Sequence, residues 1–182
     1  MERRTFLRNA GALGFGLFGS SLIEITRATG RSNPVIMIVS GWQDVNIGDI
    51  AHTPGLLSLL QEYLPEARLI LWKKSAISKV DEMLLKYFPA LEIIHGSFDR
   101  NLVPKEDELI RAFRESDFFL HGSGPSVVAA DWIRCWNLNT AKPFGIFGVT
   151  IETIDDKLRD LLLKASFIYT RETSSIGILK KS

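Results

Sequence analysis

The sequence has little cysteine, little net charge and no long apolar run, and each shortage excludes a class of protein. The single cysteine, Cys135, rules out a disulfide within the chain and a cysteine-rich zinc site. The 22 basic and 21 acidic side chains leave a net charge of +1, without the basic excess typical of nucleic-acid-binding proteins. The apolar run Val35–Val39 is too short to span a membrane. We therefore expect neither a nucleic acid nor a bound metal ion as a partner.

The length and composition are those of one globular domain. The chain has 182 residues, of which 46% are hydrophobic and 24% are charged. This is enough to bury a sizeable core, and it leaves no room for a second domain of ordinary size. No internal repeat or low-complexity tract interrupts the chain. We place this domain at residues 33–182.

The first 32 residues have the features of an export leader. Arg3 and Arg4 precede Phe6 and Leu7, and a glycine-rich, weakly apolar run follows. This pattern is typical of a twin-arginine (Tat) signal, so we predict a signal peptide and linker over residues 1–32 and a periplasmic or other extracytoplasmic location. The segment 26–29 is a poor cleavage site, so an uncleaved leader is the one predicted contact with a membrane. The alternative interpretation is a disordered basic tail.

From residue 33 onward, short apolar segments alternate with helical patterns. The predicted strands begin near Val35, Ala67, Leu91, Asp117, Pro143 and Ser166. Six strand-then-helix units at this spacing predict an α/β fold, a doubly wound parallel Rossmann-like sheet with about six strands and right-handed crossovers.

Three sequence signals predict where helices begin. Thr53 and Pro54 match a capping hydroxyl followed by proline at the first helical position, which leaves residues 40–52 as a loop. The Ser78-x-x-Asp81 pattern resembles a capping box, and Asp155 with Asp156 places acidic side chains in a first turn. Three residues of the helical pattern 127–138 are expected in the core or at an interface: Trp132, Cys135 and Trp136.

Ligands of such sheets bind at the carboxyl ends of the strands. The first strand, the glycine-bearing loop after it and the following helix N-terminus together form the kind of site that binds anions and sugars. Candidate ligand-binding residues come from this segment and from the loops after the fourth, fifth and sixth strands. They are Asp44, Asn46, Gly48, Asp49, His52, His121, Gly122, Ser123, Gly124, Ser126, Thr150 and Arg171.

Each candidate also has a purely structural interpretation. The glycines can serve only to permit a tight turn. Asn46 and Asp49 can cap the following helix and order the loop. His121 can be a hydrogen-bonded histidine at a strand end, and Arg171 can form a weak ion pair with Glu172.

Four stretches together resemble motifs of the polysaccharide pyruvyl transferase family. Asn46–Asp49 is similar to its Gly-Asn-x-Gly-Asp loop, and residues 116–126 resemble its strand ending in a Gly-Gly-Gly-Ser type loop. Lys142–Thr150 is similar to the next strand, and Arg171–Ser175 to the Arg-(Asp/Glu)-x-x-Ser signature. The motifs occur in the family's order between Val35 and Lys181. The chain departs from the pattern at Ser123, where the family often has glycine, and at residues 42–44, where it has small residues.

The resemblance implies one half of a two-domain, glycosyltransferase-B-like enzyme. Family members transfer the enolpyruvyl group of phosphoenolpyruvate, as a ketal, onto sugar hydroxyls of cell-surface polysaccharides. The implied partners are thus a saccharide acceptor and an anionic donor substrate, with no cofactor. Residues of the first and fourth loops would position the sugar. The basic residues and the general acid lie largely in the family's second half, so no catalytic residue is assigned and the chain alone is not expected to turn over.

Two other functions stay open at this stage. One is an exported carbohydrate-binding module without turnover, and the other is a glycosyltransferase that uses a nucleotide sugar. Arginines and a histidine in downstream loops would favour transfer from an anionic donor.

Overall fold

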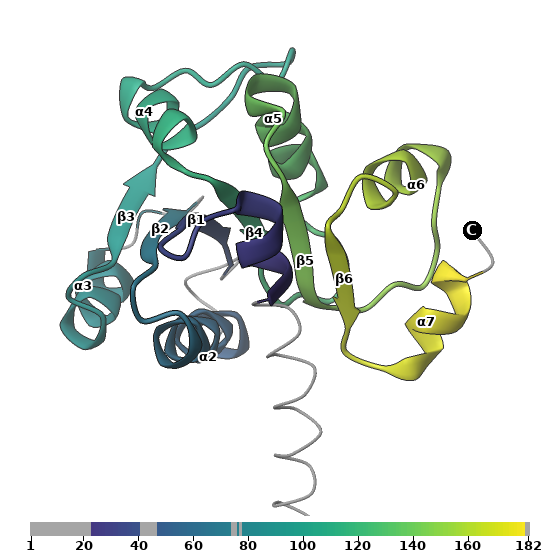
Figure 1. Ribbon diagram of the computed structural model, residues 1–182, viewed down its shortest axis with the longest axis horizontal. Helices are drawn as coiled ribbons and strands as arrows, with labels where there is room; N and C mark the ends of the chain where they lie inside the picture. Colours follow the sequence, from purple (N-terminus) through teal and green to yellow (C-terminus); the bar gives the residue numbers. More distant parts are fainter. Residues whose placement is uncertain (1–22, 41–46, 74–75, 77, 181–182) are drawn as a thin grey trace, which may run out of the picture.

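The computed structural model describes residues 23–40, 47–73, 76 and 78–180. Its centre is a six-stranded, all-parallel sheet in the order β3-β2-β1-β4-β5-β6 (Figure 1). The strands are β1 (Val35–Val39), β2 (Arg68–Lys73), β3 (Glu92–His95), β4 (Phe118–His121), β5 (Phe144–Val149) and β6 (Phe167–Thr170). Each begins within one residue of its predicted start. The predicted fold class is therefore confirmed.

The strands form because their side chains are apolar on both faces. In β1, Met37 and Val39 belong to one buried cluster, whereas Ile36 and Ile38 belong to the other. Successive side chains of a strand point to opposite faces, so one continuous apolar run supplies both halves of the core. All four residues of β4 are buried, as expected for a central strand with helices on both sides.

Helices cover the two faces of the sheet. They are α2 (Ile47–Tyr63), α3 (Ser78–Tyr87), α4 (Asp107–Glu115), α5 (Ala130–Thr140), α6 (Asp156–Leu162) and α7 (Thr173–Leu179). Figure 1 shows α2 and α3 on one face, and α4 and α5 on the other. The Asp155 carboxylate accepts the Leu158 N–H at 2.7 Å, so the predicted start of α6 has a working cap. No helix in the described part of the chain is long and apolar enough to cross a membrane.

The predicted start of α2 at Thr53 and Pro54 is wrong. The helix begins at Ile47 and includes Pro54 in its interior. Proline there removes one backbone hydrogen bond, a cost that tertiary packing overrides because Leu57 and Leu60 on this helix are fully buried. Three candidates expected in a loop, Gly48, Asp49 and His52, therefore lie in the first two turns of α2. The candidates Asp44 and Asn46 lie outside the described residues.

The end of the segment assigned to the leader packs on the domain. Residues 23–29 are helical, and Gly30 follows with a positive φ of 64° and donates its N–H to the Thr26 carbonyl at 2.9 Å. This is a glycine-terminated helix end of the common left-handed kind. Ile25 of this helix is 1% exposed and belongs to the cluster on the α2 side of the sheet. The core thus begins before residue 33, the predicted domain start.

Two glycines give a matched test of this packing. A Cβ on Gly145 of β5 would lie 2.4 Å from the Phe167 ring, whereas a Cβ on Gly55 of α2 would meet nothing within 4 Å. We expect Gly145→Ala to lower the free energy of unfolding by about 1–3 kcal/mol, because the ring must shift within a packed core. Gly55→Ala should raise it by about 0.5–1 kcal/mol, through better helix propensity. Urea unfolding measures both, and equal effects of the two changes would contradict the packing.

Candidate functional site

The loops after β4 and β5 lie side by side at the carboxyl edge of the sheet. Gly124 pairs with Val149 in an isolated parallel bridge beyond the ends of the regular ladder. The Gly124 N–H donates to the Gly148 carbonyl at 3.2 Å, and the Thr150 N–H donates to the Gly124 carbonyl at 3.3 Å. The Ser123 hydroxyl also donates to the Gly148 carbonyl, at 3.0 Å. The structure therefore brings together the candidates from these two loops.

Gly122 is required by a close approach of two strand ends. Its N–H donates to the Val39 carbonyl at 2.8 Å, so β4 continues alongside β1 for one more residue. A Cβ at this position would lie 2.6 Å from the Ser40 hydroxyl oxygen, a distance that no side chain tolerates. Gly122 thus allows the end of β4 to touch the end of β1. The structure gives this glycine a packing role, whether or not a ligand also approaches it.

His121 holds the loop after β4 and exposes no atom to a ligand. The side chain is fully buried, and its Nδ1 lies 2.6 Å from the Gly122 carbonyl oxygen. Because a carbonyl only accepts, Nδ1 carries the proton, and Nε2 accepts the Ala129 N–H at 3.3 Å, next to the start of α5. Burial lowers the pKa of His121 from 6.5 to about 4. The structural interpretation of this histidine, and not the ligand-binding one, agrees with the geometry.

The two loops enclose a hollow that contains Ser126 and Thr150. It measures about 120 Å³ and is lined by Pro125, Ser126, Val127, Thr150, Ile151, Glu152, Thr153 and Leu158. Ser126, Glu152 and Thr153 are exposed. Ligand pockets usually measure roughly 300–1,000 Å³. This hollow is therefore too small to enclose a ligand by itself and has the volume of only part of a binding site.

Glu172 and Ser175 fix the wall that β5 contributes. The Thr150 hydroxyl donates to the Glu172 carboxylate at 3.0 Å. The buried Ser175 hydroxyl donates to the same carboxylate and accepts the Ile151 N–H at 2.8 Å. The Glu172 carboxylate is thus bound to hydroxyls and forms no described ion pair with Arg171, so the ion-pair interpretation of Arg171 finds no support. Arg171 is exposed, and its backbone N–H donates to the Val149 carbonyl at 3.0 Å, beside the hollow.

The candidates on α2 are only partly described. Gly48 is exposed, and the side chain of Asp49 lies outside the description. The Nδ1 of His52 and the hydroxyl of Ser40 are buried, and neither has a hydrogen-bond partner among the described residues.

A second polar cluster at the same edge was not among the predicted site residues. Lys73 at the end of β2 and His95 at the end of β3 are register partners, and Asp81 of α3 binds both. The Asp81 carboxylate pairs with the buried Lys73 ammonium and lies 2.9 Å from the Nε2 of His95. A carboxylate only accepts, so a neutral His95 carries its proton on Nε2. The sequence signal was an unusual one, a lysine that directly follows the apolar run of β2.

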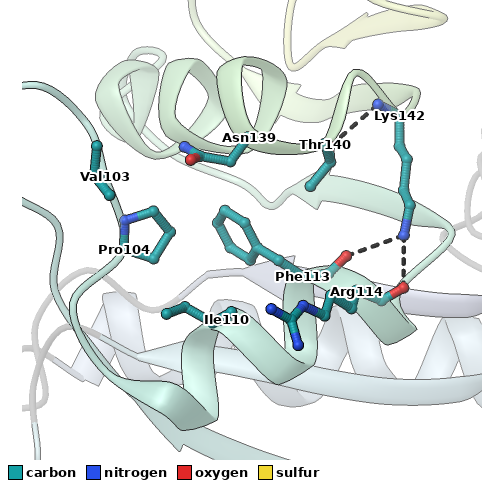
Figure 2. A pocket seen from close by; sticks show the side chains of 8 residues that line it. All are labelled: Val103, Pro104, Ile110, Phe113, Arg114, Asn139, Thr140 and Lys142. Carbon is teal, nitrogen blue, oxygen red and sulfur yellow. Dashed lines mark hydrogen bonds between the residues drawn. The ribbon is translucent and has the colours of Figure 1, made fainter.

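A larger hollow lies elsewhere, between α4 and α5 (Figure 2). It measures about 540 Å³, and the apolar side chains of Phe113 and Ile110 project into it. Its lysine is not available to a ligand, because the three protons of Lys142 Nζ go to the carbonyls of Phe113, Arg114 and Ser116 at 2.6–3.0 Å. This hollow lies on a helical face and not at the strand ends, so we do not assign it as the candidate site.

The expected core residues of α5 are buried. Trp136 and Cys135 are fully buried, and Trp132 is partly buried against the same cluster. Burial raises the pKa of the Cys135 thiol to about 12, which makes it an inert apolar group at neutral pH. Within the described ranges, no group of three or more His, Cys, Asp or Glu side chains is placed to hold a metal ion.

The parallel sheet with helices on both faces defines a Rossmann-like protein, and the candidate site lies at its carboxyl edge. The family model of polysaccharide pyruvyl transferase matches residues 46–182, and the chain belongs to this family. No curated protein matches the chain. Among solved structures, the mitomycin 7-O-methyltransferase MmcR is similar, with 14% sequence identity and a TM-score of 0.39. That match covers 90% of this chain and 48% of the methyltransferase, so this chain spans about half its length. A likeness this distant carries no argument about function.

The buried His121 predicts that stability depends on pH. Between pH 6.5 and 4 the unfolded chain protonates this histidine and the folded chain does not, so stability is lost as the pH falls through this window. The loss attributable to His121 should approach about 3 kcal/mol. Urea unfolding at pH 7, 5.5 and 4.5 measures this loss. The variant His121→Asn keeps a donor for the Gly122 carbonyl, and its free energy of unfolding should fall less steeply as the pH is lowered. The chain has three histidines, so NMR can follow each one, and a His121 that titrates near pH 6.5 would contradict its burial.

Proposed function

We propose that this chain forms the acceptor-binding part of a pyruvyl transferase that acts on a cell-surface polysaccharide. The observation that carries the proposal is the meeting of three family motifs at the carboxyl edge, where two of them line one hollow and the third holds its wall. The ends of β4, β5 and β6 meet there through the Gly124–Val149 bridge and the contacts of Glu172. The motifs are far apart in the sequence, so their meeting at one place indicates a shared task.

The polar groups of the hollow suit sugar hydroxyls. Ser126 and Thr153 supply hydroxyls, which both donate and accept, and Glu152 supplies an acceptor. The hydrogen of the Thr150 hydroxyl is used by Glu172, so Thr150 offers a ligand only its lone pairs. Among the described residues, none that lines the hollow is a lysine or an arginine. These features favour a neutral sugar at this place over a phosphate group.

An anionic donor would meet the exposed guanidinium of Arg171. Its backbone N–H donates to the carbonyl of Val149, which directly precedes Thr150, so the residue lies at the same edge. The donor we propose is phosphoenolpyruvate. In the reaction two sugar hydroxyls add to its enol carbon, the methylene group takes up a proton, and phosphate leaves, so that a cyclic ketal and inorganic phosphate are the products. The general acid for this step is not among the residues assigned here.

We also propose export by the twin-arginine route, motivated by Arg3 and Arg4. The test replaces both arginines with lysine. By cell fractionation, this variant should stay in the cytoplasm while the parent chain is exported.

Ligand binding by the full chain tests the proposed function. Saturation-transfer NMR with glucose, galactose and mannose should detect binding of at least one hexose, and Ser126→Ala should weaken it about three- to tenfold through a lost hydrogen bond. Ser58→Ala, on the exposed surface of α2, is the matched control and should change nothing. If the chain binds UDP-glucose and does not bind phosphoenolpyruvate, the glycosyltransferase is favoured instead. Hexose binding without any response to phosphoenolpyruvate would favour a binding module, and no hexose binding would contradict the acceptor site.

A further inference from the structure

The segment 23–32 joins the folded domain through the buried side chain of Ile25 and the ion pair of Arg31 with Asp117. Ile25 is 1% exposed and belongs to the cluster that also contains Ile36, Phe118 and Leu120 of the two central strands. Figure 1 draws this helix in dark purple beside the middle of the sheet. A fully buried isoleucine contributes as much to the core as one on a strand, so these residues do not behave as a linker.

Hydrogen bonds within the segment close its helix, and Arg31 then connects it to the domain. The Thr29 hydroxyl donates to the Ile25 carbonyl at 2.9 Å, and the Gly30 N–H donates to the Thr26 carbonyl at 2.9 Å. After the helix, Arg31 lies 3.2 Å from the carboxylate of Asp117, which also accepts the Val35 N–H at 2.9 Å. Asp117 thus binds both the end of this segment and the start of β1, directly before β4.

We infer that residues 23–32 are a permanent part of the domain and that no processing of the leader takes place between them. Cleavage at the poor site of residues 26–29 would remove Ile25 and leave a cavity over β1 and β4. A peptidase would also have to unwind a hydrogen-bonded helix that the core holds in place. Any cleavage of the leader must therefore take place on the N-terminal side of Ile23. This inference rests on packing alone, and it stands whether or not the proposed transferase function is correct.

The helix itself supplies a matched pair of variants. Ile23 is 61% exposed and Ile25 is 1% exposed, although they are two residues apart on the same helix. In the full chain, Ile25→Ala should lower the melting temperature by about 5–15 °C, from the cost of a core cavity. Ile23→Ala removes the same atoms from an exposed position and should shift it by no more than about 2 °C. Equal melting temperatures of the two variants would overturn the inference.

The second measurement concerns the amino terminus of the protein as a cell produces it. The full chain, leader included, is expressed in a bacterium with a twin-arginine pathway, and the intact mass of the recovered protein is determined. A mass that includes residues 23–32 supports the inference, whether the leader is complete or trimmed before Ile23. A mature terminus between residues 24 and 33 would overturn it.

Discussion

The carboxyl edge of this protein depends on the close contact between the ends of β1 and β4. These are the two central strands, and the sheet order reverses between them, so the loops that follow them leave in opposite directions. The contact is possible because residue 122 is glycine, since any side chain would collide with Ser40. With β4 held against β1, its loop can extend along β5 and form the bridge at Gly124.

The residues of the family motifs then divide into two groups by what they touch. His121, Glu172 and Ser175 bind backbone or other side chains within the protein and fix the loops in place. Ser126 lines the hollow and is exposed, and Arg171 is exposed beside it. Thr150 belongs to both groups, because it lines the hollow and donates its hydroxyl proton to Glu172. The neutral state of the buried His121 fits the first group, because a charged imidazolium would be costly there and could not accept the Ala129 N–H. These hydrogen bonds hold the loops in place without a ligand, and such preorganisation lowers the cost of binding.

The fold could be predicted almost completely from the sequence, whereas the side-chain contacts at the carboxyl edge could not. Buried parallel strands are marked by short apolar runs, so their starts were found within one residue. The start of α2 was missed because Pro54 imitates a first helical position, whereas the helix begins at Ile47 and buries Thr53 directly before the proline. The burial of His121 and the meeting of Lys73, Asp81 and His95 depend on strand register and on packing across elements, which no local pattern contains. The burial of Ile25 was missed because residues 1–32 were assigned as a whole to the leader and linker, and one apolar residue in such a segment gives no separate signal for the core.

The central claim is that ligands bind at the carboxyl edge between the loops after β4 and β5, and not in the larger hollow between α4 and α5. The most direct measurement is a map of backbone amide NMR shifts for the labelled full chain, as phosphoenolpyruvate and then a hexose are added. The account predicts shifts concentrated in residues 122–126 and 150–153 and at Arg171. Shifts concentrated at Val103, Ile110 and residues 139–142, with the carboxyl edge unchanged, would contradict it.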